Sequence, residues 1–319
     1  MPISRKKTGK SGKAVKPRKA ARVRKPARPG KAAGPARTGR AKKNLRVRVS
    51  EGIGFCSGVT RAIKVALAAT GHADQVVTLG PLIHNPQVVE KLIEVGVKPL
   101  RRLGKGGKAL VIRSHGASPE VLEKARQRGY KVIDATCPFV SKAQKNALKL
   151  YRMGYGVVIV GEKSHPEVKG IRSQVGGKVI VVESSDQAKR LKFGARVGII
   201  AQTTIPVDTF ASVVAEISKR AREVLVFNTI CIETAKRQEG ARALAGNVDV
   251  LLVVGGRNSA NTSRLESLCR TICPSTHHIE TASEIDGRWF RKDSTVGIVA
   301  GASTPKWLVT NIVARLRRL

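Results

Sequence analysis

The chain has 319 residues, and its 60 Lys and Arg against 22 Asp and Glu give a formal net charge of +38. This excess favours acidic partners, which include phosphorylated ligands, acidic proteins and nucleic acids. There is no run of about 18 or more apolar residues and no apolar stretch after the first positive charges, so we expect neither a membrane-spanning segment nor a secretory signal. Five widely spaced cysteines do not suggest a disulfide framework, which favours a reducing, cytoplasmic location.

The N-terminal segment is the most biased part of the sequence. Residues 1–48 contain 19 Lys and Arg and no acidic residue, and residues 11–43 consist largely of Lys, Arg, Ala, Pro and Gly. Such a segment has little to bury and repels itself, so we predict a disordered tail over residues 1–45. Three interpretations of the tail stay open: a solubilising extension, an arm that binds nucleic acid non-specifically through phosphates, and a transit peptide.

After residue 45, short Val/Ile-rich runs alternate with helical patterns, which is typical of βαβ units with parallel sheets. We predict strands within these runs: 45–49, 75–80, 109–116, 131–137, 156–162, 178–184, 197–204, 223–231, 248–256 and 294–303. The pattern predicts an α/β fold with three similar small domains whose sheets are mostly parallel. We place the domains at residues 46–130, 131–222 and 223–319.

Three cysteines mark the repeat. Cys56, Cys137 and Cys231 lie in "GFCSGVTRA", "ATCPFVSKA" and "TICIETAKR", each with a β-branched residue three positions later and Arg or Lys five positions later. They are 81 and 94 residues apart, about the length of one small α/β domain. A thiol between a strand and a helix N-terminus is placed to become a thiolate, because the helix dipole favours anionic sulfur.

Polar loops follow the other strands of each copy. One set reads "GPLIHNPQ" (80–87), "GEKSHPEV" (161–168) and "GGRNSANT" (255–262), and a second reads "RSHGAS" (113–118), "AQTTIP" (201–206) and "AGASTP" (300–305). Ligands of open parallel sheets bind beyond the carboxyl ends of the strands. Three sheets that face a shared axis would therefore bring the three cysteines together with these loops around them.

Three converging cysteines without a fourth fit two kinds of metal site. One is a zinc site with an open position, and the other is a [4Fe–4S] cluster in which one iron lacks a protein ligand. Three unrelated buried cysteines are the structural alternative. The other two cysteines, Cys269 and Cys273, lie one helical turn apart among Leu and Ile. We interpret them as a helix-face core rather than as a second metal site with His277 and His278.

Several loop residues are candidates for binding or proton transfer. His84, His115 and His165 each follow an apolar run, and Glu167 lies two residues after His165, where it could deliver a proton. Ser, Thr and Asn side chains and helix N-termini in these loops suit a phosphate or diphosphate, although N-capping explains any one of them. The neutral candidates are Thr203, Ser259, Asn261 and Ser303.

Taken together, these segments resemble the 4-hydroxy-3-methylbut-2-enyl diphosphate reductase (LytB/IspH) family from about residue 46 to the C-terminus. The resemblance implies three α/β domains in a pseudo-three-fold arrangement around a central [4Fe–4S] cluster bound by Cys56, Cys137 and Cys231. It implies a two-electron reductive dehydroxylation that yields isopentenyl and dimethylallyl diphosphate, the last step of the non-mevalonate isoprenoid pathway. Electrons would come from a ferredoxin or flavodoxin.

The resemblance also assigns roles to single residues. It implies a diphosphate held by His84, His115, Ser259, Asn261 and Ser303, and a proton relay at Glu167. It further implies that the pocket is lined by His165, Thr203 and Thr234. Ala260 stands where some members have a second serine, so the backbone would have to supply one hydrogen bond to phosphate. Two alternatives stay open: another cluster-dependent dehydratase, and a nucleic-acid-binding protein that acts through its basic tail.

Overall fold

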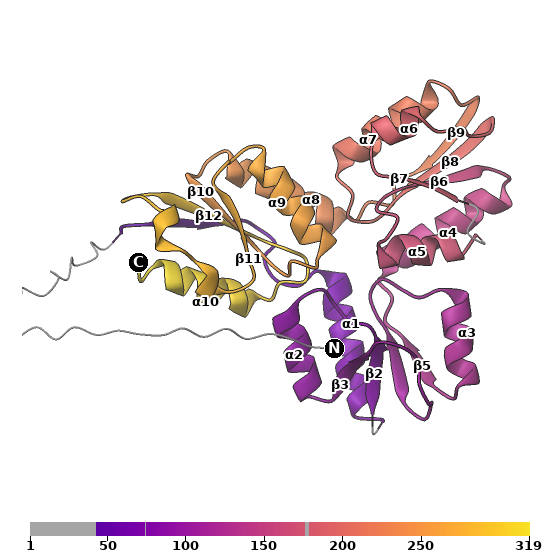
Figure 1. The fold of residues 1–319 in the computed structure, drawn as a ribbon, viewed down its shortest axis with the longest axis horizontal. Coiled ribbons are helices and arrows are strands. Elements are labelled where there is room, and N and C mark those ends of the chain that lie inside the picture. Colours follow the sequence, from indigo (N-terminus) through magenta and orange to yellow (C-terminus); the bar gives the residue numbers. More distant parts are fainter. Residues whose placement is uncertain (1–42, 74, 176–178) are drawn as a thin grey trace, which may run out of the picture. The chain divides into compact units, whose positions relative to one another are not determined.

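The computed structural model describes residues 43–73, 75–175 and 179–319. The predicted tail lies outside the described residues except for positions 43–45. The described part contains three four-stranded sheets, and every strand pair within them is parallel. Helices cover both faces of each sheet (Figure 1). The predicted fold class, three parallel α/β units, is confirmed.

The first sheet has the order β3-β2-β4-β5, with bounds Val97–Leu100, Val76–Leu79, Ala109–Ile112 and Lys131–Asp134. One face packs against α1 (Ser57–Thr70) and α2 (Pro86–Glu94), and the other against α3 (Pro119–Gln127). Side chains alternate between the two faces along β4. Ala109 and Val111 join the cluster under α1, whereas Leu110 and Ile112 join the cluster under α3, as a strand buried on both sides requires.

The second sheet repeats this plan with the order β7-β6-β8-β9, whose bounds are Val179–Val182, Gly156–Val160, Arg196–Ala201 and Glu223–Phe227. One face carries α4 (Pro138–Arg152) and α5 (Pro166–Ser173), and the other carries α6 (Ser185–Lys189) and α7 (Val207–Ser218). Gly198 in β8 allows α4 to pack closely, because a Cβ at this position would lie 2.7 Å from a Leu150 methyl carbon.

The third sheet has the order β11-β10-β12-β1, with bounds Thr276–Ile279, Val250–Val254, Thr295–Ala300 and Arg46–Val49. Its helices are α8 (Ile232–Ala245) and α9 (Ala260–Arg270) on one face and α10 (Lys306–Leu316) on the other. Its topology equals that of the first two sheets once β1, the N-terminal strand, is counted as the fourth strand of this last sheet. The described part contains no helix long and apolar enough to cross a bilayer.

The predicted domain ranges divide the sheets differently from the structure. β5 at 131–134 pairs with β4 in the first sheet, β9 at 223–227 pairs with β8 in the second, and β1 pairs with β12 in the third. Each predicted range therefore begins one strand too early. The cause is the repeat unit: the last strand of a sheet runs directly into its cysteine, and only the helix after the cysteine packs on the next sheet.

All ten predicted runs contain a strand, but two strands were missed. β3 carries Pro99 and lies at the edge of its sheet, where a missing N–H is tolerated, and β11 reads Thr-His-His-Ile. The segment from 264 to 278 was predicted as one helix face, and this is wrong in part. α9 ends at Arg270, so Cys273 follows the helix, although both Cys269 and Cys273 are buried in the core as expected.

Candidate active site

Each repeated cysteine occupies the same structural position. Cys56, Cys137 and Cys231 are the N-cap residues of α1, α4 and α8. The backbone N–H groups of the three donate to the carbonyl oxygens of Ala302 (3.0 Å), Ser114 (2.9 Å) and Thr203 (2.9 Å) respectively. Each acceptor lies in the polar loop after the third strand of the same sheet. The hydrogen bond thus fixes each cysteine beside a loop from a neighbouring strand.

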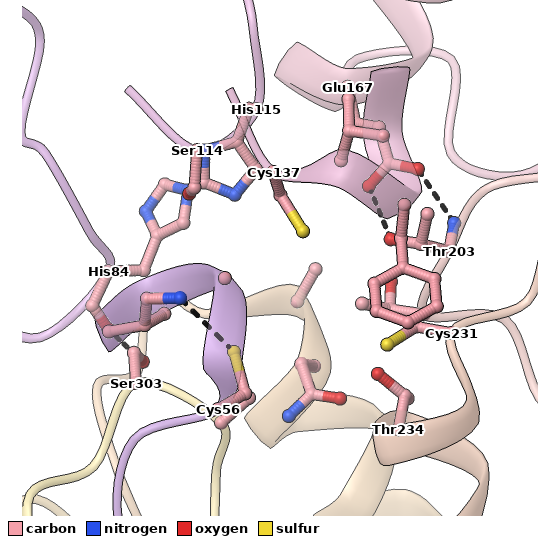
Figure 2. A pocket seen from close by; sticks show the side chains of 18 of the residues that line it. Cys56, His84, Ser114, His115, Cys137, Glu167, Thr203, Cys231, Thr234 and Ser303 are labelled. Carbon is pink, nitrogen blue, oxygen red and sulfur yellow. Dashed lines mark hydrogen bonds between the residues drawn. The ribbon is translucent and has the colours of Figure 1, made fainter. Parts of the chain in front are cut away.

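The three thiols line one pocket. Figure 2 shows the sulfur-bearing side chains of Cys56, Cys137 and Cys231 around a common space. Gly58 in the first turn of α1 keeps part of this space open, because a Cβ there would lie 2.6 Å from the Cys137 sulfur and 3.9 Å from the Cys56 sulfur. All twelve residues predicted for the site line this same pocket.

Burial outweighs the helix N-termini in setting the acidity of two thiols. Burial raises the pKa of Cys56 and Cys137, and hydrogen bonds from backbone N–H groups of Val59, Phe139 and Val140 lower them only in part. The helix N-termini therefore favour thiolate as predicted, but burial opposes them and has the larger effect on these two thiols. A metal group would have to displace the thiol protons when it binds.

Three histidines form one wall of the pocket. The ring centroids of His84 and His115 are 4.8 Å apart, those of His115 and His165 5.4 Å, and those of His84 and His165 6.4 Å. One nitrogen from each ring lies within 4.8 Å of the others, a spacing that could hold a metal ion or an oxyanion.

The histidines are neutral donors rather than cations. Burial lowers the pKa of His84, holds that of His115 well below its usual range and lowers that of His165 to about 3, with nearby Arg113 adding to each effect. His165 Nδ1 accepts the backbone N–H of Glu167 at 3.2 Å, so the proton of this neutral ring is on Nε2. The buried Nδ1 atoms of His84 and His115 have no partner among the described residues.

Glu167 forms a compact pair with Thr203. The carboxylate is 1% exposed, and it accepts the Thr203 backbone N–H at 2.7 Å and the Thr203 hydroxyl at 2.8 Å. Burial raises the pKa of Glu167, and these two hydrogen bonds reduce the rise without cancelling it. A buried carboxyl group that keeps its proton at higher pH than usual, next to a hydroxyl in the pocket, is suited to proton transfer.

The third unit contributes neutral hydrogen-bonding groups. Ser259 is the N-cap of α9, where its hydroxyl accepts the Thr262 N–H at 3.3 Å, and Asn261 lies in the first turn with a buried, unpartnered amide nitrogen. The Ser303 hydroxyl donates to the His84 carbonyl oxygen at 3.1 Å. Thr234 is buried in the first turn of α8, and Ala260 also lines the pocket.

A comparison with models of known protein families matches residues 47–317 to the family described as LytB protein. The chain belongs to the LytB family. Two curated relatives in it are named 4-hydroxy-3-methylbut-2-enyl diphosphate reductase. The protein of Pelobacter propionicus is 48% identical over 85% of this chain and 98% of its own length. The protein of Geobacter metallireducens is 47% identical over 86% of this chain and 98% of its own length.

Two solved structures are similar to this LytB-family chain. One is (E)-4-hydroxy-3-methyl-but-2-enyl diphosphate reductase, described as the terminal enzyme of the non-mevalonate pathway. It is 45% identical with a TM-score of 0.63 and covers 86% of this chain and 99% of its own. The other is the E-1-hydroxy-2-methyl-but-2-enyl-4-diphosphate reductase of Plasmodium falciparum, at 25% identity and a TM-score of 0.79, covering 86% of this chain and 87% of its own.

The sequence analysis missed several residues at this LytB-family site. Ser114 and Thr204 line the pocket beside the predicted His115 and Thr203, and the pattern of polar loops could have included them. Arg264 could not be found this way, because it lies within α9. Its guanidinium donates to the Thr204 hydroxyl at 2.6 Å and pairs with Glu162 of the His165 loop, and so joins the third unit to the second.

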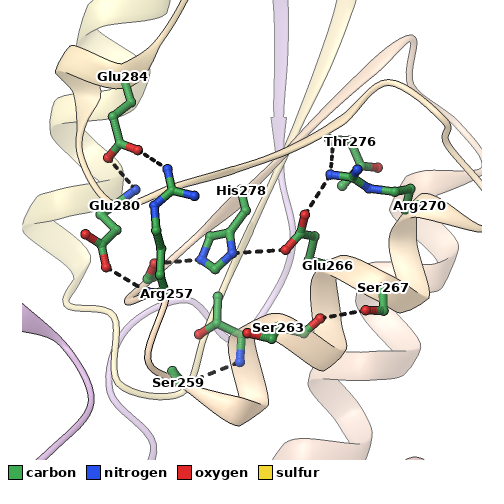
Figure 3. Close-up of polar contacts among 12 residues, drawn as sticks. Arg257, Ser259, Ser263, Glu266, Ser267, Arg270, Thr276, His278, Glu280 and Glu284 are labelled. Atoms are coloured by element: carbon green, nitrogen blue, oxygen red, sulfur yellow. Dashed lines mark hydrogen bonds and ion pairs between the residues drawn. The ribbon is translucent and has the colours of Figure 1, made fainter.

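His278 supports the loop that leads to Ser259 (Figure 3). Its Nδ1 lies 3.0 Å from Glu266 and its Nε2 2.8 Å from the Gly255 carbonyl oxygen. Gly255 begins the turn that leads to Ser259. The next residue, Gly256, packs closely on the His84 backbone, because a Cβ on Gly256 would lie 2.5 Å from the His84 carbonyl oxygen. Both ring nitrogens of His278 therefore contact oxygen atoms, one on α9 and one on the turn after β10.

Replacing His278 should destabilise the protein more than replacing its neighbour. His278→Phe keeps a ring but removes the contacts of both ring nitrogens. Glu266 keeps its ion pair with Arg270, whereas the Gly255 carbonyl oxygen loses its side-chain partner, so we expect the melting temperature to fall by about 4 °C. His277→Phe is the matched control, because His277 stacks on Trp289 at 3.9 Å and a Phe ring preserves that contact. Equal melting temperatures for the two variants would refute the supporting role of His278.

Proposed function

We propose that this chain is a [4Fe–4S]-dependent 4-hydroxy-3-methylbut-2-enyl diphosphate reductase. The reaction is the two-electron reductive dehydroxylation of (E)-4-hydroxy-3-methylbut-2-enyl diphosphate to isopentenyl and dimethylallyl diphosphate, the last step of the non-mevalonate pathway. One observation supports this most strongly: three cysteines from three sheets share a pocket with three neutral histidines and a buried carboxyl group. Relatives and a solved structure with this name, 45–48% identical, add to it.

The residues around the thiols fit an iron–sulfur cluster. Cys56, Cys137 and Cys231 supply three soft ligands and lie at three helix N-termini, which favour an anionic group. Gly58 leaves room beside two of the sulfurs, and the Val59 N–H already lies 3.4 Å from the Cys56 sulfur as a donor. When bound, the cluster would supply electrons and a Lewis-acidic iron without a protein ligand.

The substrate's diphosphate would be bound by hydrogen bonds from neutral groups. The pocket lining includes His84, His115, Ser259, Asn261 and Ser303. Three buried nitrogens in this set have no partner among the described residues, and a polar ligand would satisfy them: His84 Nδ1, His115 Nδ1 and Asn261 Nδ2. Neutral imidazoles donate N–H groups to the diphosphate without a competing ion pair. Ala260 is the first residue of α9, so its backbone N–H has no helical partner and can replace the missing serine hydroxyl.

Glu167 and Thr203 would deliver a proton to the leaving hydroxyl group. The Thr203 hydroxyl donates to the Glu167 carboxylate, and protonation of Glu167 would reverse this hydrogen bond. The Thr203 hydroxyl could then donate into the pocket, so that a proton moves along a chain of two bonds. His165 Nε2–H orients the substrate beside this pair. The apolar residues Val59, Ile83, Phe139 and Val140 line the same pocket, where they pack on the hydrocarbon chain and exclude water.

The electron donor would be a small acidic redox protein in the cytoplasm. Each turnover needs two electrons, and a ferredoxin or flavodoxin delivers them singly. Residues 49–319 hold 41 Lys and Arg against 22 acids, a surplus of positive charge that attracts acidic carriers. The basic tail, residues 1–45, is not needed for this chemistry, and non-specific binding of nucleic acid remains its proposed role.

Turnover should depend strictly on a reductant. Anaerobically prepared protein with reduced methyl viologen should convert the substrate to isopentenyl and dimethylallyl diphosphate, measured by chromatography of the products. Without reductant, no product should form. Product formation at the same rate without reductant would instead identify a cluster-dependent dehydratase and contradict the reductase assignment.

Glu167→Gln should slow turnover by about 100-fold or more, the usual contribution of a general acid, while iron content and substrate affinity are retained. The matched control is Glu162→Gln in the same loop, which removes a carboxylate that pairs with Arg264 outside the proton path. Because a general acid works only below its pKa, the wild-type rate should fall as pH rises through the raised pKa of Glu167. Near wild-type turnover in Glu167→Gln would refute the proton-donor role.

A further inference from the structure

A second cavity lies on the opposite side of the strand end that carries His115. Its volume is about 240 Å³, and its lining includes Leu79, Ile112, Arg113, Ser118, Val121 and Lys169. Ser114 and His115 line the active-site pocket, whereas Arg113 immediately before them lines only this second cavity. The consecutive residues therefore separate two cavities, and only one of them is used by the proposed reaction.

Arg113 is a half-buried cation whose guanidinium has no acceptor among the described residues. Burial lowers the pKa of its guanidinium, and no residue in the described ranges forms a hydrogen bond or ion pair with it. Gly80 makes room for the group, because a Cβ there would lie 3.0 Å from Arg113 Nη1. Partial burial weakens the hydration of the guanidinium and no protein acceptor compensates for it, so its environment favours an anion in the cavity that it faces.

The other walls define the kind of anion. Lys169 adds a second cation without an acidic partner among the described residues, and Ser118 caps the nine-residue helix α3, whose N-terminus also favours negative charge. Leu79, Ile112 and Val121 form an apolar wall. No carboxylate lines the cavity; Glu120 in the first turn of α3 lies outside the lining. A ligand with an anionic head and a short aliphatic chain matches both parts.

We propose that this cavity binds an isoprenoid diphosphate and that its occupancy weakens binding of substrate in the active-site pocket. The choice of isoprenoid rests on the proposed function, because this class is the product of the reaction and of the condensations that consume it. The head would accept from Arg113 and Lys169, and the chain would lie along Val121 and Leu79.

The direction of the coupling follows from charge. Burial is the largest cause of the lowered pKa values of His84, His115 and His165, and the positive charge of Arg113 is a smaller cause of all three. The charge of Arg113 therefore acts on the active-site pocket. An anion on Arg113 cancels part of that positive potential and repels a second diphosphate. Occupancy should therefore raise KM for the substrate, and the inhibition should be of mixed type, because the two ligands occupy different cavities.

Calorimetric titration of the holoenzyme with geranyl diphosphate tests this site. Substrate without reductant is not consumed, so it can be kept saturating to block the active-site pocket. Under this condition we expect one remaining geranyl diphosphate site per chain, with a lower affinity than in the absence of substrate, because the coupling is reciprocal. Inorganic diphosphate, which lacks the chain, should bind there about 10-fold more weakly. Val121→Trp, which fills the cavity, and Arg113→Gln should each weaken the site at least about 10-fold. Lys163→Gln, which changes an exposed lysine outside the cavity lining, should leave it unchanged.

Two results would overturn the proposal: no binding once substrate is saturating, or unchanged binding in Val121→Trp. Equal affinity for inorganic and geranyl diphosphate would overturn the isoprenoid assignment. Failure of the reductase assay with the second site intact would refute the proposed function alone, whereas loss of the second site with normal turnover would refute only this inference.

Discussion

The hydrogen bond from each cysteine N–H to the loop of a neighbouring strand is the contact on which the site depends. Parallel strands end at the same edge of a sheet, so a cysteine after the fourth strand lies beside the polar loop after the third. The helix that follows leaves that sheet and packs on the next one. The chain therefore passes from sheet to sheet at Cys56, Cys137 and Cys231, and one pocket contains all three crossings.

Burial sets the protonation states in that pocket more than any ion pair does. It keeps His84, His115 and His165 uncharged and raises the pKa of Glu167 and of two cysteine thiols. Burial also gives the unpartnered nitrogens of the pocket a free-energy cost, which a hydrogen-bonding ligand would remove. A pocket of neutral donors with one buried acid of raised pKa is matched to a substrate that brings its own negative charge and needs a proton at its other end.

The cysteine repeat and the polar loops were predictable from the sequence, because strand, thiol and helix follow one another locally and recur three times. The sharing of strands was not. Nothing local to residues 46–49 shows that they complete the last sheet rather than begin the first, since that pairing joins the two ends of the fold. The strands β3 and β11 were not predicted, because Pro99 and two histidines interrupt the apolar pattern of these segments. The Glu167–Thr203 pair and the Arg264 contact join residues far apart in the chain and carry no sequence signal.

The central claim is that three crossings of the chain form one iron–sulfur site, and metal analysis of single cysteine variants tests it most directly. Anaerobically purified wild-type protein should hold about four irons and four sulfides per chain. Cys56→Ser, Cys137→Ser and Cys231→Ser should each lose the cluster, whereas Cys269→Ser and Cys273→Ser, which change core cysteines, should keep it. A colourless wild-type protein with one zinc, or loss of iron in Cys269→Ser but not in Cys56→Ser, would contradict the account.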